Sequence, residues 1–252
     1  MKLLTPALCA KLALTIEAYK YNGYKYRASR ETFEENNQIL ANDIAEDLGR
    51  NYQNFQSLLT SFIAGLKQPG SKNKDLTVYD FWGYGCYCLP ASGMPLSGGF
   101  GEPVDNLDRI CFNRKRCIGC LEINHPDGKC DPETVRYRYE TKTSGDNEST
   151  VEGKCLNKKG SCARSVCECD MKLAHEIREH LINEPKGYQM KHNLFVGKFD
   201  RDLQCQKRHN GGSAPDMCCD DGTGYMLSYS SLTHDCCPNG SGGNAIRMLG
   251  NC

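Results

Sequence analysis

Three consecutive cations, Arg114, Lys115 and Arg116, are the residues of this chain that most need a chemical explanation. They lie within residues 103–120, where Asp105 is suited to cap a helix and apolar side chains then recur every three or four residues. The face formed in this way comprises Leu107, Ile110, Cys111, Arg114 and Ile118. A helix that turns this face to the core must accommodate at least one permanent positive charge there.

The composition indicates a disulfide framework in an oxidising compartment. The 252 residues, enough for one or two domains, include 17 cysteines and 25 glycines. The cysteines do not form repeated Cys-x-x-Cys pairs with histidines, so secreted disulfides are favoured over zinc. Two Asn-x-Ser sequons predict glycosylation at Asn147 and Asn239, which agrees with an extracellular location. The formal net charge is zero, so no nucleic-acid partner is expected and any electrostatic partner must bind a local patch.

The first part of the chain predicts a leader followed by helices. Residues 1–30 are interpreted as a signal or pro-segment, although Lys11 interrupts its apolar run and the start of a frayed helix remains the alternative. Removal of a signal would also remove Cys9 and leave sixteen cysteines. Residues 31–75 predict a helical segment with apolar stripes, which ends in a polar loop. No stretch approaches the roughly twenty apolar residues of a membrane span.

A set of motifs then covers about residues 77–205. It comprises Tyr79-Asp-Phe-Trp-Gly-Tyr-Gly-Cys-Tyr-Cys88, Pro103-Val-Asp-Asn-Leu-Asp-Arg109, Cys117, and Cys162 through Cys167-Glu-Cys169-Asp170. Together these motifs resemble the secreted phospholipase A2 family. The resemblance implies a mainly α, disulfide-rich domain over residues 76–204, with two long antiparallel helices and a small β-wing. The residues agree, because 135–141 and 150–154 are β-prone and 171–182 form an amphipathic pattern.

The resemblance also implies a set of disulfides. The implied pairs are Cys88–Cys111, Cys117–Cys169, Cys155–Cys167 and Cys130–Cys162, with Cys86–Cys205 as a further pair. Another bond of the family would require cysteines where this chain has Ile110 and Glu176, and both are absent together. The partners of Cys9, Cys120 and the C-terminal cysteines are not assigned, and Cys120 could pair within the chain or with a second copy.

The catalytic positions of the family are changed in this chain. Such enzymes use a neutral histidine as general base, an aspartate that orients it, and calcium that polarises the ester. By resemblance Asp170 is the orienting aspartate, whereas Arg114 stands at the histidine position and Lys115 at the calcium aspartate position. Arginine cannot accept a proton at neutral pH, and lysine brings a cation to the calcium position. We therefore expect no intact catalytic residues, no metal site and no cofactor, with calcium required only if the enzyme is active.

The charge pattern leads to a structural hypothesis for the altered site. We predict that Arg114 forms a buried ion pair with the vestigial Asp170, while Lys115 or Arg116 faces solvent. An anion-binding patch at residues 113–116 is the alternative reading of the same cations. The loop after Cys88 departs as well, because by resemblance Leu89 stands where glycine is expected and Pro90 and an insertion follow, although Gly98, Gly99 and Gly101 could rebuild a loop. All six histidines are expected at the surface: His125, His175, His180, His192, His209 and His234.

A second cysteine-rich module is predicted at residues 205–252. It contains two vicinal pairs, Cys218-Cys219 and Cys236-Cys237, within Gly- and Ser-rich sequence. This spacing resembles the dicysteine repeats of galaxin-like extracellular proteins, some of which occur in mineralised skeletons. The resemblance implies a matrix or adhesion role, and a stapled tail that only covers the domain is the alternative.

Three classes of function follow from these observations. The first is a secreted, catalytically inactive phospholipase A2-like protein that binds extracellular matrix, mineral or another anionic ligand. The second is an active calcium-dependent phospholipase A2 that hydrolyses the sn-2 ester of phospholipids at a membrane surface. The third is a toxin-like or receptor-binding protein.

Overall fold

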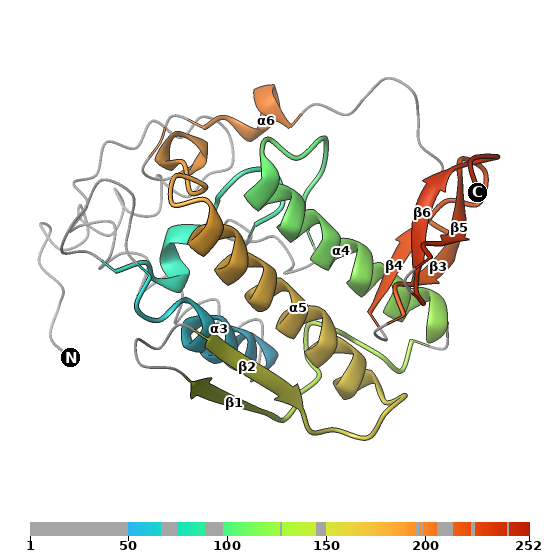
Figure 1. Ribbon diagram of the computed structural model, residues 1–252, viewed down its shortest axis with the longest axis horizontal. Helices are drawn as coiled ribbons and strands as arrows, with labels where there is room; N and C mark the ends of the chain where they lie inside the picture. The colour runs from blue at the N-terminus through green and yellow to red at the C-terminus, as the bar shows by residue number, and fades with distance from the viewer. Residues whose placement is uncertain are drawn as a thin grey trace, which may run out of the picture.

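The fold combines a helical core with a two-stranded wing and a C-terminal pair of hairpins, as the computed structural model in Figure 1 shows. The structure describes residues 50–66, 75–88, 98–126, 128–144, 150–194, 197, 199–205, 214–222, 225–240 and 242–252. The helices are α3 (Arg50–Ile63), η1 (Val78–Phe81), α4 (Asn106–Asn124), α5 (Cys162–Asn183), η2 (Met190–His192) and α6 (Arg201–Gln204). The strands are β1 (Tyr139–Ser144), β2 (Thr150–Cys155), β3 (Met217–Asp220), β4 (Met226–Tyr229), β5 (His234–Pro238) and β6 (Asn244–Met248).

The long helices α4 and α5 lie side by side and run in opposite directions (Figure 1). Asp105 caps α4, because its carboxylate accepts a hydrogen bond from the backbone N–H of Asp108 at 2.9 Å. Ser161 caps α5 in the same way. A disulfide between Cys117 and Cys169 joins the two helices. The sequence pattern placed the start of α5 nine residues too late, since its first turns bury cysteines rather than a regular apolar stripe.

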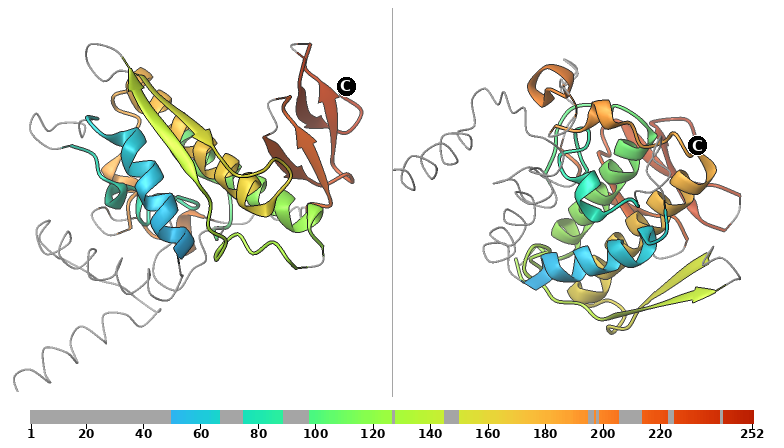
Figure 2. Two further views of the ribbon diagram at one scale, coloured as in Figure 1. Left: turned by 90° about the horizontal axis from the view of Figure 1, so that it is seen from below. Right: turned by 90° about the vertical axis from the view of Figure 1, so that its left-hand side faces the viewer.

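Helix α3 packs against α5 and completes the apolar core (Figure 2). Its inner face buries Phe55, Leu58, Leu59 and Phe62 completely. Buried Arg178 of α5 donates from its guanidinium to the carbonyl of Phe62 at 2.6 Å, and so satisfies a helix-end acceptor. The N-terminal part of the predicted helical segment and the predicted leader lie outside the described residues. Among the helices that are described, none has the length and apolar character to cross a membrane.

The wing is the antiparallel pair β1 and β2, in which Tyr139 lies opposite Cys155. Its β1 strand begins four residues later than the β-prone stretch predicted from the sequence. The preceding residues still alternate between exposed and buried positions, with Tyr137 buried. One face of the wing therefore packs on the core while the other faces solvent.

The C-terminal region is built from strands, and the mainly α description holds only for the domain that precedes it. The strands form two antiparallel hairpins, β3 with β4 and β5 with β6. The first hairpin packs on α4, where Gly119 leaves space for Ser228, since a Cβ at Gly119 would lie 2.9 Å from the Ser228 Oγ. Arg116 strengthens this contact, because its Nε donates to the carbonyl of Ser228 at 2.9 Å.

Eight disulfides join described cysteines. Five of them have the pairings that the phospholipase A2 resemblance implies: Cys86–Cys205, Cys88–Cys111, Cys117–Cys169, Cys130–Cys162 and Cys155–Cys167. The other three are Cys120–Cys218, Cys219–Cys236 and Cys237–Cys252. Adjacent residues of a strand point to opposite faces, so each vicinal pair sends one disulfide back along the chain and one forward.

Candidate functional site

The centre of the candidate site is an ion pair between α4 and α5. Arg114 donates from Nε to Asp170 Oδ1 at 2.7 Å, and the exposed fractions of the two side chains are 6% and 0%. The other carboxylate oxygen accepts a hydrogen bond from the hydroxyl of Tyr137 at 2.8 Å. The guanidinium carbon lies 4.7 Å from the ring centroid of Phe55, within the range of a cation–π contact. The structure thus brings Arg114 and Asp170 together and gives each a further partner.

Burial and mutual attraction act in opposite directions on these groups. Burial raises the pKa of Asp170, and the nearby Arg114 charge and the bond from Tyr137 only partly offset it. Burial lowers the pKa of Arg114, but the negative charge of Asp170 more than compensates, so this pKa lies above its ordinary value. Burial and Asp170 raise the pKa of Tyr137. Both Arg114 and Tyr137 therefore keep their protons at neutral pH, and neither can act as a base on water.

Lys115 lies on the side of α4 that faces the glycine-rich loop. Its ammonium group donates to the carbonyl oxygen of Gly99 and lies 5.4 Å from the ring centroid of Tyr87. Gly99 has φ of 113°, and a Cβ there would come within 2.5 Å of the Cys86 carbonyl oxygen, so only glycine fits. The positive charge of Lys115 is thus bound to a backbone oxygen of this loop. The preceding residues of the loop, Leu89 and Pro90 included, lie outside the described residues.

The prediction that Lys115 or Arg116 faces solvent is wrong. Both side chains are only partly exposed, and both donate to backbone carbonyls. Burial lowers the pKa of Arg116, which lies beneath the β3–β4 hairpin. The sequence could not reveal this contact, because Ser228 is 112 residues away along the chain.

Two further buried charges position the segment that precedes the loop, and sequence reasoning missed their role. Asp108 is fully buried and accepts hydrogen bonds from the backbone N–H groups of Cys86 and Tyr87, each at 2.8 Å. Burial raises the pKa of Asp108, and these backbone bonds oppose the rise. Arg201 of α6 donates from Nε to the Gly85 carbonyl at 2.8 Å. The motif 79–88 is therefore held between a carboxylate and a guanidinium.

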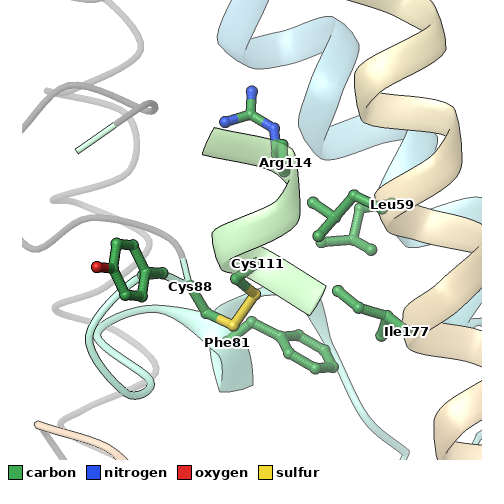
Figure 3. Close-up of a pocket in the computed structure, with 8 residues that line it drawn as sticks. Leu59, Phe81, Cys88, Cys111, Arg114 and Ile177 are labelled. Carbon is green, nitrogen blue, oxygen red and sulfur yellow. A yellow bond between two sulfur atoms is a disulfide. The ribbon is translucent and has the colours of Figure 1, made fainter. Parts of the chain in front are cut away.

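A small cavity lies beside the ion pair, next to the Cys88–Cys111 disulfide (Figure 3). It leaves about 10 Å³ for the centre of a water-sized sphere, which is at the lower limit for one water molecule. Leu59, Phe81 and Ile177 close its apolar side, and the guanidinium of Arg114 points away from the disulfide (Figure 3).

The histidines depart in part from the prediction that all are at the surface. The Nδ1 atom of His192 lies 2.7 Å from Asp105 Oδ2, and only 15% of each side chain is exposed. His180 is also largely buried, with 9% of its side chain exposed. Neither histidine lines the cavity beside Arg114. His209 lies outside the described residues.

The predicted glycosylation positions differ in what the structure says of them. Asn147 lies outside the described residues, whereas Asn239 is exposed after β5. The side-chain oxygen of Asn239 accepts a hydrogen bond from the Gly243 N–H at 3.1 Å. Within the described parts of the chain, no group of three or more His, Cys, Asp and Glu side chains is arranged to hold a metal ion.

Comparison with known proteins supports the family resemblance of the central part of the chain. Residues 66–189 match the family described as phospholipase A2. The matched residues, which include α4, the wing and α5, are thus similar to phospholipase A2.

Individual relatives are basic phospholipase A2 chains of beta-bungarotoxin. The A1 chain from Bungarus candidus is 38% identical over 97 residues, which are 37% of this chain and 58% of the relative. The A-AL4 chain from Bungarus multicinctus is 39% identical over 98 residues, 39% of this chain and 59% of the relative. The A1 chain from Bungarus caeruleus is 37% identical over 95 residues, 38% of this chain and 53% of the relative. The match thus spans less than three fifths of each of these relatives.

Proposed function

We propose that this chain is a secreted phospholipase A2-like protein that has lost calcium-dependent ester hydrolysis and acts by binding in the extracellular space. The observation that carries the proposal is the buried ion pair of Arg114 with Asp170. In the family that the motifs resemble, a neutral histidine stands at the Arg114 position and removes a proton from water. A guanidinium that donates to Asp170 has no lone pair for that proton.

The residues around Lys115 do not fit a calcium ion. Calcium is held by oxygen ligands, usually including carboxylates. Here an ammonium group donates to the Gly99 carbonyl, so that this oxygen faces a positive charge supplied by the protein itself. A bound calcium would have to displace Lys115 and tolerate its charge nearby, which electrostatic repulsion opposes. No step of a reaction is therefore assigned to calcium.

Lipid hydrolysis and calcium binding are measured in parallel to test this proposal. Ester release from phosphatidylcholine vesicles is followed with calcium and with chelator, using an active phospholipase A2 as positive control. We expect no calcium-dependent release and no calorimetric signal from calcium up to millimolar concentration. Fatty acid released from the sn-2 position in a calcium-dependent manner would overturn the proposal in favour of an active phospholipase A2.

Two kinds of extracellular role remain candidates for the inactive scaffold. A matrix or mineral role is supported by the C-terminal hairpins. Their vicinal cysteines Cys218 and Cys219 form disulfides with Cys120 and Cys236, respectively. A toxin-like or receptor-binding role is supported by the relatives, which are toxin chains by name. Extraction from tissue separates the two, since a matrix protein stays in the insoluble fraction until demineralisation or denaturant releases it. A toxin-like protein is recovered from the soluble secretion.

A further inference from the structure

The outward face of the wing carries a row of charged side chains. Inward residues such as Tyr137, Val151 and Cys155 are buried against the core, while every second residue between them faces solvent. Figure 2 shows the two strands at the outer edge of the molecule. On the outward face Glu140 and Lys142 of β1 lie opposite Lys154 and Glu152 of β2. The exposed residues that continue the two segments are Arg136, Arg138, Leu156 and Lys158.

The charges on this face are not evenly distributed. Towards the tip, Glu140 pairs across the strands with Lys154, and Lys142 with Glu152. The first of these pairs has an N–O distance of 3.9 Å. Opposite charges therefore cancel over the ladder itself.

The base of the wing has a different character. It carries four exposed cations, which we call the cationic cluster: Arg136, Arg138, Lys158 and Lys159. Leu156 lies opposite Arg138, because its N–H donates to the Arg138 carbonyl at 2.8 Å. Moving away from this pair towards the base, the next exposed charged residues of the two segments are cations, Arg136 on one and Lys158 and Lys159 on the other. The same end of the wing leads into the N-terminus of the 22-residue helix α5, whose dipole adds positive potential.

The backbone that carries the cationic cluster is fixed by hydrogen bonds. The N–H of Arg138 donates to Asn157 Oδ1 at 2.6 Å. Arg164 of α5 donates from Nη1 to the carbonyls of Cys155 at 2.9 Å and of Asn157 at 3.2 Å. The Ser161 hydroxyl donates to the Lys158 carbonyl at 2.7 Å. The four cations thus project from a preorganised scaffold, which lowers the entropic cost of binding.

We propose that the cationic cluster of the wing binds a sulfated linear polysaccharide. The planar guanidinium groups of Arg136 and Arg138 suit bidentate hydrogen bonds to sulfate oxygens, and the lysines add point charges. A membrane surface fits less well, because Leu156, with 42% exposure, is the one large apolar side chain exposed on this face within the described residues. A single exposed leucine supplies little area for insertion into lipid. This surface is separate from the Arg114 site and does not depend on whether that site is active.

The test compares two variants of the full chain with the same net charge. In the wing variant Arg136, Arg138, Lys158 and Lys159 are replaced by serine. The control variant makes the same replacement at two arginines and two lysines that are exposed elsewhere, Arg109, Arg247, Lys186 and Lys191. Binding is measured on immobilised heparin as a function of salt, and binding to vesicles with phosphatidylserine is measured beside it. Circular dichroism checks that each variant is folded.

We expect the wing variant to bind heparin at least about tenfold more weakly near physiological salt, with a shallower dependence on salt because fewer counterions are released. The control variant should bind within about twofold of the original chain, because its charge loss acts only at long range through salt. Equal loss in the two variants would overturn the proposal, since it would mean that only net charge matters. Tight binding to the vesicles without binding to heparin would overturn it in favour of an anionic membrane.

Discussion

Replacing Arg114 with methionine isolates the charge of Asp170 in the core. Methionine keeps most of the apolar stem that packs near Phe55 but removes the guanidinium that lies 2.7 Å from the carboxylate. Asp170 then keeps the hydrogen bond from the hydroxyl of Tyr137, at 2.8 Å. Removal of one member of a buried ion pair destabilises a protein by about 3–5 kcal/mol. Asp170 can limit that loss by binding a proton.

Protonation of Asp170 limits the loss of unfolding free energy to a maximum that depends on pH. An unfolded aspartate has a pKa of about 3.9, and each pH unit above it adds about 1.4 kcal/mol to the cost of keeping the carboxyl protonated. The destabilisation from this source is therefore at most about 4 kcal/mol at pH 7 and about 1.5 kcal/mol at pH 5. In the variant the folded pKa of Asp170 is raised further than in the original chain. Its stability is consequently greatest at low pH and is lost as pH rises towards the folded pKa.

Urea unfolding with the disulfides intact measures this effect between pH 5 and pH 7. The difference in unfolding free energy between the original chain and Arg114→Met should grow with pH by about 1.4 kcal/mol per unit. The double variant Arg114→Met with Asp170→Asn is the control, because it has no buried charge, and its difference should stay nearly constant. A pH-independent difference in the single variant would refute the reasoning, since Asp170 would then not be the source of the destabilisation.

Two further predictions concern neighbours of the site. Tyr137→Phe removes the hydroxyl that donates to Asp170, so we expect a loss of about 1.5–3 kcal/mol in urea unfolding; an unchanged midpoint would contradict the role of that bond. Gly119→Ala places a methyl group 2.9 Å from the Ser228 Oγ, and we expect about 1–3 kcal/mol of destabilisation with faster proteolysis of the β3–β4 hairpin. Adding Ser228→Ala should recover part of the loss, and no recovery would exclude this contact as the cause.

The sequence predicted the helix around the three cations well because its signals are local. Asp105 stands at the cap, and Leu107, Cys111, Arg114 and Ile118 on the expected face are buried. The phospholipase A2-like domain was also recognisable, since the motifs carry fixed cysteine spacings. The proximity of Arg114 to Asp170 required one more step, the pairing of two helices, which the resemblance supplied.

The contacts of Lys115 and Arg116 could not be predicted in the same way. A helix pattern specifies which side of α4 a residue occupies, but it does not specify what packs on that side. Arg116 is covered by a hairpin more than a hundred residues later in the chain. His192 was misjudged for a similar reason, because Asp105, which lies 2.7 Å away, has its own expected role as a helix cap. The position of His192 in the sequence gives no sign that Asp105 also pairs with this histidine.

The vicinal cysteines of the C-terminal hairpins have a mechanical consequence. Disulfides run from Cys120 to Cys218, from the neighbouring Cys219 to Cys236, and from the neighbouring Cys237 to Cys252. Tension applied at Cys252 therefore passes through three covalent bridges and short strand segments directly into α4. The hydrogen bonds of the hairpins lie outside this load path, as does the loop closed by Cys120 and Cys218, which are 98 positions apart in the sequence. Under tension the region would stay short until a disulfide is reduced, and each reduction would release a defined length of chain.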